Sequence, residues 1–216
     1  MGVLMSNSYM DEIIELFGKI KIIPVITIEE VKDAIPLAEA LIDGGLPCAE
    51  ITFRTSAAAE VISKLAERTD IHTGAGSVLT VDQAKLAVDK GARFIVSPGF
   101  NPKVVKYCLD NKIPVFPGAC TPSDFTLAVE YELSILKFFP AEALGGFRTL
   151  KAMSAPFPML KFIPTGGINT QNIKDYLQFP KVLACGGSWM VKKELINEKK
   201  FGEIQQLVLE AVSLVS

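Results

Sequence analysis

The sequence predicts a single-domain α/β protein, a (β/α)8 TIM barrel preceded by an extra N-terminal helix. Short apolar, β-rich runs recur at a spacing of roughly 20 to 27 residues, which is typical of parallel strands that alternate with helices. Eight such runs alternate with eight helical patterns, which is the count of this barrel. No linker, charge block or low-complexity tract divides the 216 residues, which indicates one domain over residues 1–216.

The strands are expected in eight apolar runs, at residues 21–28, 48–53, 71–78, 94–99, 114–120, 135–140, 161–167 and 182–189. The helices between and after them are expected at residues 31–45, 56–69, 80–91, 101–112, 121–132, 145–153, 169–178 and 201–215, and the extra helix at 8–19. A doubly wound open sheet is the alternative fold, but no G-x-G-x-x-G motif follows the first strand.

Polar residues at helix starts support these limits. Thr80 is followed three residues later by Gln83, and Asn169 is followed by Asn172. A capping side chain with a polar residue three positions on is typical of a helix N-terminus. We therefore expect helices to begin at Thr80 and Asn169.

The composition argues against several classes of partner. The 22 Lys and Arg residues nearly balance 24 Asp and Glu, and the net charge of −2 comes with no basic cluster. A nucleic-acid partner or an anionic membrane partner is therefore not expected. No run approaches the roughly 18 apolar residues of a membrane span, and the N-terminus does not have the pattern of a signal peptide. Four scattered cysteines favour reduced thiols and a cytoplasmic location.

The second predicted strand places two charged side chains inside the barrel. Barrel strands alternate between the interior and the helix layer. The apolar set Ala49, Ile51 and Phe53 suits the helix layer, so the other set, which includes Glu50 and Arg54, points inward.

The same alternation places a lysine on the interior of the sixth strand. Leu136 and Phe138 suit the helix layer, so Lys137 and Phe139 face inward. In the seventh strand, Thr165 has the inward position. Inward polar groups therefore gather towards the carboxyl ends of the strands, where barrel enzymes place their active sites.

A lysine in an apolar interior has a destabilised ammonium form, which favours the free amine as a nucleophile. Lys137 is therefore predicted to form a Schiff base with a ketone, with Glu50 as the proton shuttle and Arg54 as the partner of a substrate carboxylate. The alternative for Glu50 is a structural ion pair with Lys137 or Arg54. One histidine cannot build a three-histidine zinc site, although a carboxylate-held Mg²⁺ stays open. We predict no metal and no cofactor beyond the covalent lysine.

Two late strands end in glycine pairs, Gly166-Gly167 and Gly186-Gly187, and Ser188 follows the second pair. In barrels, the loops after strands seven and eight commonly bind phosphate through exposed backbone N–H groups. The glycines in the GAGS run of residues 74–77 are less specific and are expected mainly to relieve crowding. The residues therefore predict a Schiff-base lyase that acts on a phosphorylated 2-oxo acid.

The ordered motifs EITFRT, GAGSVL, SPGF, KFFPAE, PTGGI and GGSW resemble those of the 2-keto-3-deoxy-6-phosphogluconate (KDPG) aldolases, which often also act on 4-hydroxy-2-oxoglutarate (KHG). The resemblance runs from about Ile22 to Trp189. It implies a class I aldolase on a (β/α)8 barrel, a homotrimer, with pyruvate and glyceraldehyde 3-phosphate as products.

The resemblance also implies a role for each matching residue. Lys137 would be the Schiff-base lysine and Glu50 the acid/base. The residues that bind or line the substrate would be Arg54 and Ser77 at the pyruvate carboxylate, Pro98 and Phe139 in the pocket wall, Thr165 at the hydroxylated chain, and Gly166, Gly167, Gly187 and Ser188 at the phosphate.

The sequence departs from the family at two points. The family usually has threonine where Ser77 stands, so we expect retained but looser carboxylate binding. The run CTPSD also differs, and Cys120 is expected to alter the pocket wall. Thr165 favours the gluconate over the galactonate epimer, a preference that one hydroxyl contact shifts but does not make absolute. A phosphosugar isomerase and a non-catalytic barrel that binds a phosphorylated acid are the other function classes.

Overall fold

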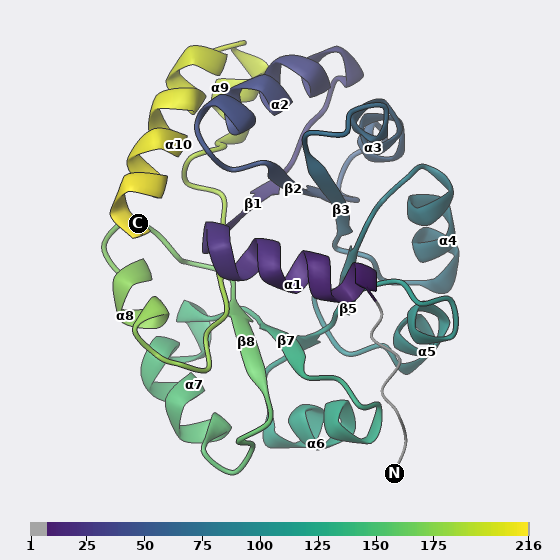
Figure 1. Cartoon of the computed structure of the whole chain (residues 1–216), viewed down its shortest axis with the longest axis vertical. Coiled ribbons are helices and arrows are strands. Elements are labelled where there is room, and N and C mark those ends of the chain that lie inside the picture. The colour runs from purple at the N-terminus through teal and green to yellow at the C-terminus, as the bar shows by residue number, and fades with distance from the viewer. Residues whose placement is uncertain (1–7, 216) are drawn as a thin grey trace.

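The computed structural model describes residues 8–215 of the chain, and parallel strands surround a central axis in it (Figure 1). The strands are β1 (Ile22–Ile26), β2 (Cys48–Thr52), β3 (His72–Gly76), β4 (Ile95–Val96), β5 (Val115–Phe116), β6 (Gly118–Ala119), β7 (Ile135–Phe138), β8 (Lys161–Pro164) and β9 (Cys185–Gly187).

The strands form a closed barrel. Hydrogen bonds join them in the orders β5-β4-β3-β2-β1-β9 and β6-β7-β8, and single bridges such as Thr165 to Gly186 join β8 to β9. The chain passes from β5 to β6 through Pro117, which splits the strand predicted at 114–120 because proline has no N–H for the ladder. The (β/α)8 fold class is confirmed.

The helices cover the outside of the barrel (Figure 1). They are α2 (Ala34–Asp43), α3 (Ala58–Ala66), α4 (Val81–Asp89), α5 (Pro102–Asp110), α6 (Pro122–Glu130), α7 (Gly146–Ser154), α8 (Ile173–Leu177), α9 (Lys193–Asn197) and α10 (Phe201–Val215), with short 3-10 turns η1 (Val31–Asp33) and η2 (Glu142–Leu144). Helix α9 and the two 3-10 turns were not expected. No helix within residues 8–215 is long and apolar enough to span a bilayer.

One of the two predicted helix starts is confirmed. Thr80 caps α4, where its hydroxyl accepts from Gln83 N at 3.2 Å. The start expected at Asn169 is wrong, because α8 begins at Ile173 with Asn172 as its N-cap. The carboxamide of Asn169 instead accepts from Gln171 N at 2.8 Å, so these side chains hold a turn that precedes the helix.

The predicted alternation of side chains is confirmed by two separate buried clusters. Outward residues of β2, β7 and β8, including Ala49, Ile51, Leu136, Phe138 and Phe162, pack in the helix layer. Inward residues near the amino ends of the strands, including Cys48, Ile135 and Ile163, pack with Ile13 and Phe17 of α1 (Ser8–Ile20) inside the barrel.

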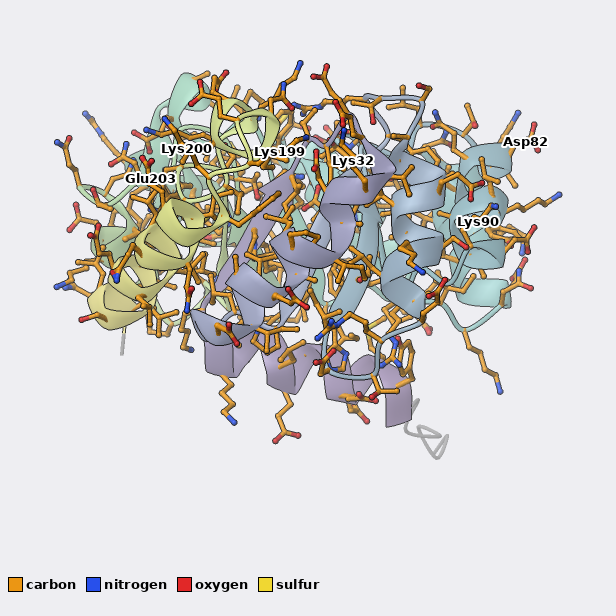
Figure 2. The ribbon with its side chains drawn as sticks, turned by 90° about the horizontal axis from the view of Figure 1, so that it is seen from above. Lys32, Asp82, Lys90, Lys199, Lys200 and Glu203 are labelled. Atoms are coloured by element: carbon orange, nitrogen blue, oxygen red, sulfur yellow. The ribbon has the colours of Figure 1, made fainter. Side chains whose placement is uncertain are left out.

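Helix α1 closes one end of the barrel. It crosses the barrel axis in Figure 1 and lies along the lower end in Figure 2, opposite the end that carries Lys32 and Lys199. The Phe17 ring lies 5.2 Å from Phe94 and 5.3 Å from Phe116, and all three side chains are buried. The carboxyl ends of the strands, where the predicted site residues lie, therefore form the other end of the barrel.

Candidate active site

Lys137 and Glu50 meet inside the barrel. Lys137 Nζ donates to Glu50 Oε1 at 3.1 Å, and the two residues are 5% and 3% exposed. They come from β7 and β2, which are not neighbours in the sheet, so the pair spans the interior. Of the two cations weighed as the partner of Glu50, the structure therefore brings Lys137 to it. A buried amine and carboxylate at this distance can exchange a proton directly.

Two glycines make room for this pair. A Cβ on Gly76 would lie 2.1 Å from Glu50 Oε1, and one on Gly118, which pairs with Lys137 in the sheet, would lie 2.1 Å from the carbonyl oxygen of Pro98. At Gly118 the clash is with backbone, so no side chain fits there, and at Gly76 a side chain would displace the Glu50 carboxylate. The expectation that the GAGS glycines relieve crowding is confirmed, and at Gly76 the group that needs the space is the Glu50 carboxylate.

Phe139 lies beside the lysine at the start of a pocket of about 150 Å³. Lys137 Nζ is 5.4 Å from the centre of the Phe139 ring, within the range of a cation–π contact. The inward position predicted for Phe139 therefore places an apolar face between the amine and the loops at the barrel mouth.

Arg54 and Ser77 follow adjacent strands, and Arg54 Nε donates to Ser77 Oγ at 3.3 Å. Ser77 has a backbone φ of 55°, and Arg54 lines the same pocket as Phe139. A guanidinium and a hydroxyl held together in this way can bind a carboxylate. Pro98 approaches the site through its carbonyl group at Gly118, but its side chain lines a separate hollow on the adjoining surface.

The glycine loops form the far wall of the pocket, which Thr165, Gly166, Gly167, Gly186, Gly187 and Ser188 line together. Gly166 and Gly167 have φ values of 96° and 82°, which glycine adopts without strain. A Cβ on Gly187 would lie 1.9 Å from the Trp189 ring, so the backbone there must be bare. The structure therefore brings every predicted phosphate residue to one pocket with Arg54 and Phe139.

The sequence reasoning missed an outer chamber at the same mouth. This chamber, of about 520 Å³, shares Val25, Arg54 and Ser188 with the inner pocket, and its further lining residues are Thr27, Trp189, Val191, Lys192, Lys193 and Glu194. The loops after β1 and β9 form it because those strands are neighbours in the closed sheet. The missed residue Gly186 leaves room for Thr165, whose Oγ1 would lie 2.3 Å from a Cβ there.

Cys120 belongs to a helix cap. Its N–H donates to Asp124 Oδ2 at 2.9 Å, and Thr121 and Asp124 form a capping box at the start of α6. Cys120 is not among the residues that line the two chambers described above, and its effect on the pocket wall stays a prediction. All four cysteines are free thiols, as predicted.

His72 lies away from this site, at the start of β3, with Nδ1 3.8 Å from Glu12 Oε1 of α1. His72 is therefore a residue of the strand start that contacts α1, not part of the site. Among residues 8–215, no group of three His, Cys, Asp or Glu side chains is placed to hold a metal ion.

Comparisons with known proteins show the family of the chain. The family model described as KDPG and KHG aldolase matches residues 13–207. A 2-dehydro-3-deoxy-phosphogluconate aldolase of Treponema pallidum is 45% identical over 95% of this chain and 99% of its own length. One of Haemophilus influenzae is 47% identical over 94% of this chain and 97% of its own.

A solved structure extends the similarity to three dimensions. The KDPG aldolase of Legionella pneumophila, with pyruvate captured at low pH as a covalent carbinolamine intermediate, superposes with a TM-score of 0.88 and 40% identity. The match covers 91% of this chain and 96% of that one. The chain therefore belongs to the KDPG and KHG aldolase family.

Proposed function

We propose that the chain is a class I aldolase that cleaves 2-dehydro-3-deoxy-6-phosphogluconate to pyruvate and glyceraldehyde 3-phosphate. The observation that carries the proposal is the buried Lys137–Glu50 pair, 3.1 Å apart, beside Phe139, which lines a pocket together with the bare glycine loops. Relatives with this named activity align along nearly the whole chain, which supports it.

In the proposed reaction, the Lys137 amine attacks the C2 carbonyl carbon of the substrate and forms a carbinolamine. Loss of water then gives the Schiff base, whose cationic nitrogen accepts the electron pair when the C3–C4 bond breaks. Glu50 removes the proton from the C4 hydroxyl, and the fragment that contains C4 leaves as the aldehyde. Glu50 then returns a proton to C3 of the enamine. Water finally hydrolyses the Schiff base and releases pyruvate, so no cofactor is consumed.

The two ends of the substrate are held by different groups. We assign the carboxylate to Arg54 and Ser77, which are already hydrogen-bonded to each other. Phe139, and Pro98 through its backbone, border the pyruvate unit. We assign the phosphate to the backbone of Gly166, Gly167 and Gly187 and to the hydroxyl of Ser188, which line the same pocket as Arg54.

The same pyruvate half-site fits 4-hydroxy-2-oxoglutarate, whose cleavage gives pyruvate and glyoxylate, and we propose this as a second activity. Thr165 lines the pocket between the amine and the glycine loops, beside the hydroxylated carbons of the longer substrate. We propose that it favours the gluconate over the galactonate epimer. The isomerase and the non-catalytic barrel are set aside, because the family match covers residues 13–207.

We further propose a single domain over the whole chain, a homotrimer and a cytoplasmic location. The free thiols support a reducing compartment. Light scattering on the purified protein should give the mass of three 23.4 kDa chains, and the mass of one chain would contradict the trimer.

Trapping with borohydride tests the catalytic proposal. The protein is incubated with pyruvate and sodium borohydride, digested and mapped by mass spectrometry. We expect a reduced pyruvate adduct on Lys137 and no adduct in Lys137→Met, with the exposed Lys161 of the neighbouring strand as an internal control. An adduct on another lysine, or none, would overturn the mechanism.

A further inference from the structure

Two segments that border the proposed substrate contact each other at the barrel mouth, one after the strand of Lys137 and one in the proposed phosphate site. Residues 139–142 follow the strand of Lys137, and Gly166-Gly167 follow β8. Ala141 N donates to Thr165 O at 2.8 Å, and Glu142 N donates to Gly166 O at 3.0 Å. The segment that follows Lys137 is therefore hydrogen-bonded to the Gly166-Gly167 loop, to which the phosphate is assigned.

The side chain of Glu142 packs against the Gly166-Gly167 loop. A Cβ on Gly167 would lie 2.6 Å from both Cβ and Cγ of Glu142, so the Gly167 backbone rests directly on the Glu142 stem. A Cβ on Gly166 would lie 3.2 Å from Pro140 Cα and 3.3 Å from the Phe139 ring. The position of the loop is thus set by the residues that follow Lys137.

Tyr176 of α8 fixes the end of the Glu142 side chain. Tyr176 Oη donates to Glu142 Oε1 at 2.5 Å, and the tyrosine is 1% exposed. The Tyr176 ring also packs on Phe147, with 5.9 Å between centres. Burial and the Glu142 carboxylate raise the pKa of Tyr176, which keeps it a protonated donor. A Cβ on Gly146 would lie 2.9 Å from Glu142 Oε1, so the start of α7 also confines the carboxylate.

We infer that Glu142 and Tyr176 form a brace that positions Gly166-Gly167 for the phosphate of the substrate and so determines the preference for phosphorylated over unphosphorylated 2-oxo acids. The inference rests on the proposed function and assigns two positioning residues outside the proposed catalytic groups. Without the hydrogen bond, the Glu142 stem moves freely under the loop, and its negative charge can approach the phosphate and repel it. Neither the movement of the Glu142 stem nor its charge should shift the Lys137 amine, because that amine is hydrogen-bonded to Glu50 of β2.

The test is a set of variants assayed with 2-dehydro-3-deoxy-6-phosphogluconate and with 4-hydroxy-2-oxoglutarate. Tyr176→Phe removes only the hydroxyl, Glu142→Ala removes the stem and the acceptor, and Glu142→Gln keeps an acceptor oxygen. Tyr107→Phe, the same change on the outer helix α5, is the matched control.

We expect Tyr176→Phe and Glu142→Ala to raise KM for the phosphorylated substrate about five- to tenfold, which is within the range for the net loss of one ordinary hydrogen bond. KM for 4-hydroxy-2-oxoglutarate and kcat for both substrates should stay within about twofold. Compared with Glu142→Ala, Glu142→Gln should recover most of the affinity for the phosphorylated substrate. The double variant Tyr176→Phe, Glu142→Ala should have a KM for this substrate no higher than that of the worse single variant.

Equal KM increases for both substrates, or no increase for either, would overturn the brace. Because Glu142 is exposed, its variants test the inference even if a change at buried Tyr176 weakens folding. Failure of the aldolase proposal is a separate result: the wild-type protein would then fail to cleave either substrate or to trap pyruvate on Lys137.

Discussion

Gly76→Ala is the sharpest test of the catalytic geometry, because it adds one methyl group beside the Glu50 carboxylate and leaves every charged residue in place. The new Cβ would lie 2.1 Å from Glu50 Oε1, whereas ordinary contact begins at 3.4 Å. The carboxylate must therefore retreat by about 1.3 Å, the difference between these two distances. A misplacement of about 1 Å can cost about 100-fold in rate. We expect kcat/KM to fall by about that factor, because Glu50 no longer meets the amine at 3.1 Å.

The assay follows pyruvate release through a coupled dehydrogenase, with circular dichroism to show that the barrel is folded. Gly202→Ala is the matched control, since a Cβ there meets nothing within 4 Å and the position lies in helix α10. We expect full activity in this control. If folded Gly76→Ala keeps more than about a third of the wild-type kcat/KM, the position of Glu50 does not limit the reaction, and the reasoning from its geometry is refuted.

Four further outcomes are expected. Lys137→Met should abolish cleavage and, by leaving buried Glu50 unpaired, lower the free energy of unfolding by about 3 kcal/mol, and adding Glu50→Gln should recover part of that loss in urea denaturation. Glu50→Gln should still trap pyruvate but slow proton exchange at its methyl group, measured by NMR in D₂O, by about 100-fold or more; unchanged exchange would remove Glu50 from the acid/base role. Ser188→Ala should raise KM for the phosphorylated substrate several-fold more than for 4-hydroxy-2-oxoglutarate, and equal effects would place the phosphate elsewhere. Burial and, to a lesser extent, Arg93 lower the pKa of His72, so the unfolded chain protonates this histidine more readily than the folded protein does. Stability should therefore fall as the pH drops below the usual pKa of histidine, and His72→Gln should reduce the dependence of the melting temperature on pH in that range.

Strand alternation made the central pair predictable. The side-chain period of a strand is two residues, so the apolar residues Leu136 and Phe138 determine that Lys137 faces the other way. The same reasoning held for Glu50 between Ala49 and Ile51, and both side chains are where that pattern places them. Burial of one face of each strand was the physical signal.

The parts that the pattern did not predict lie in loops and depend on closure of the sheet. The outer chamber exists because β9 pairs with β1, which brings Lys192 and Thr27 to one mouth from opposite ends of the chain. Loops have no side-chain period, so nothing in the local sequence indicates this wall. The misplaced helix start at Asn169 has a related cause: two asparagines three residues apart suit a turn as well as a cap.

The helix that closes the amino-terminal end of the barrel has a consequence for the order of events in a catalytic cycle. Because α1 fills that end with Ile13 and Phe17, the described residues, 8–215, leave the mouth at the carboxyl ends of the strands as the route to solvent. Substrate and both products must share this route. In the proposed reaction, the phosphorylated aldehyde is held by the glycine loops of the mouth while the three-carbon fragment is still bonded to Lys137. Geometry and covalent attachment therefore dictate the same sequence of departure, with the phosphorylated aldehyde first and pyruvate last.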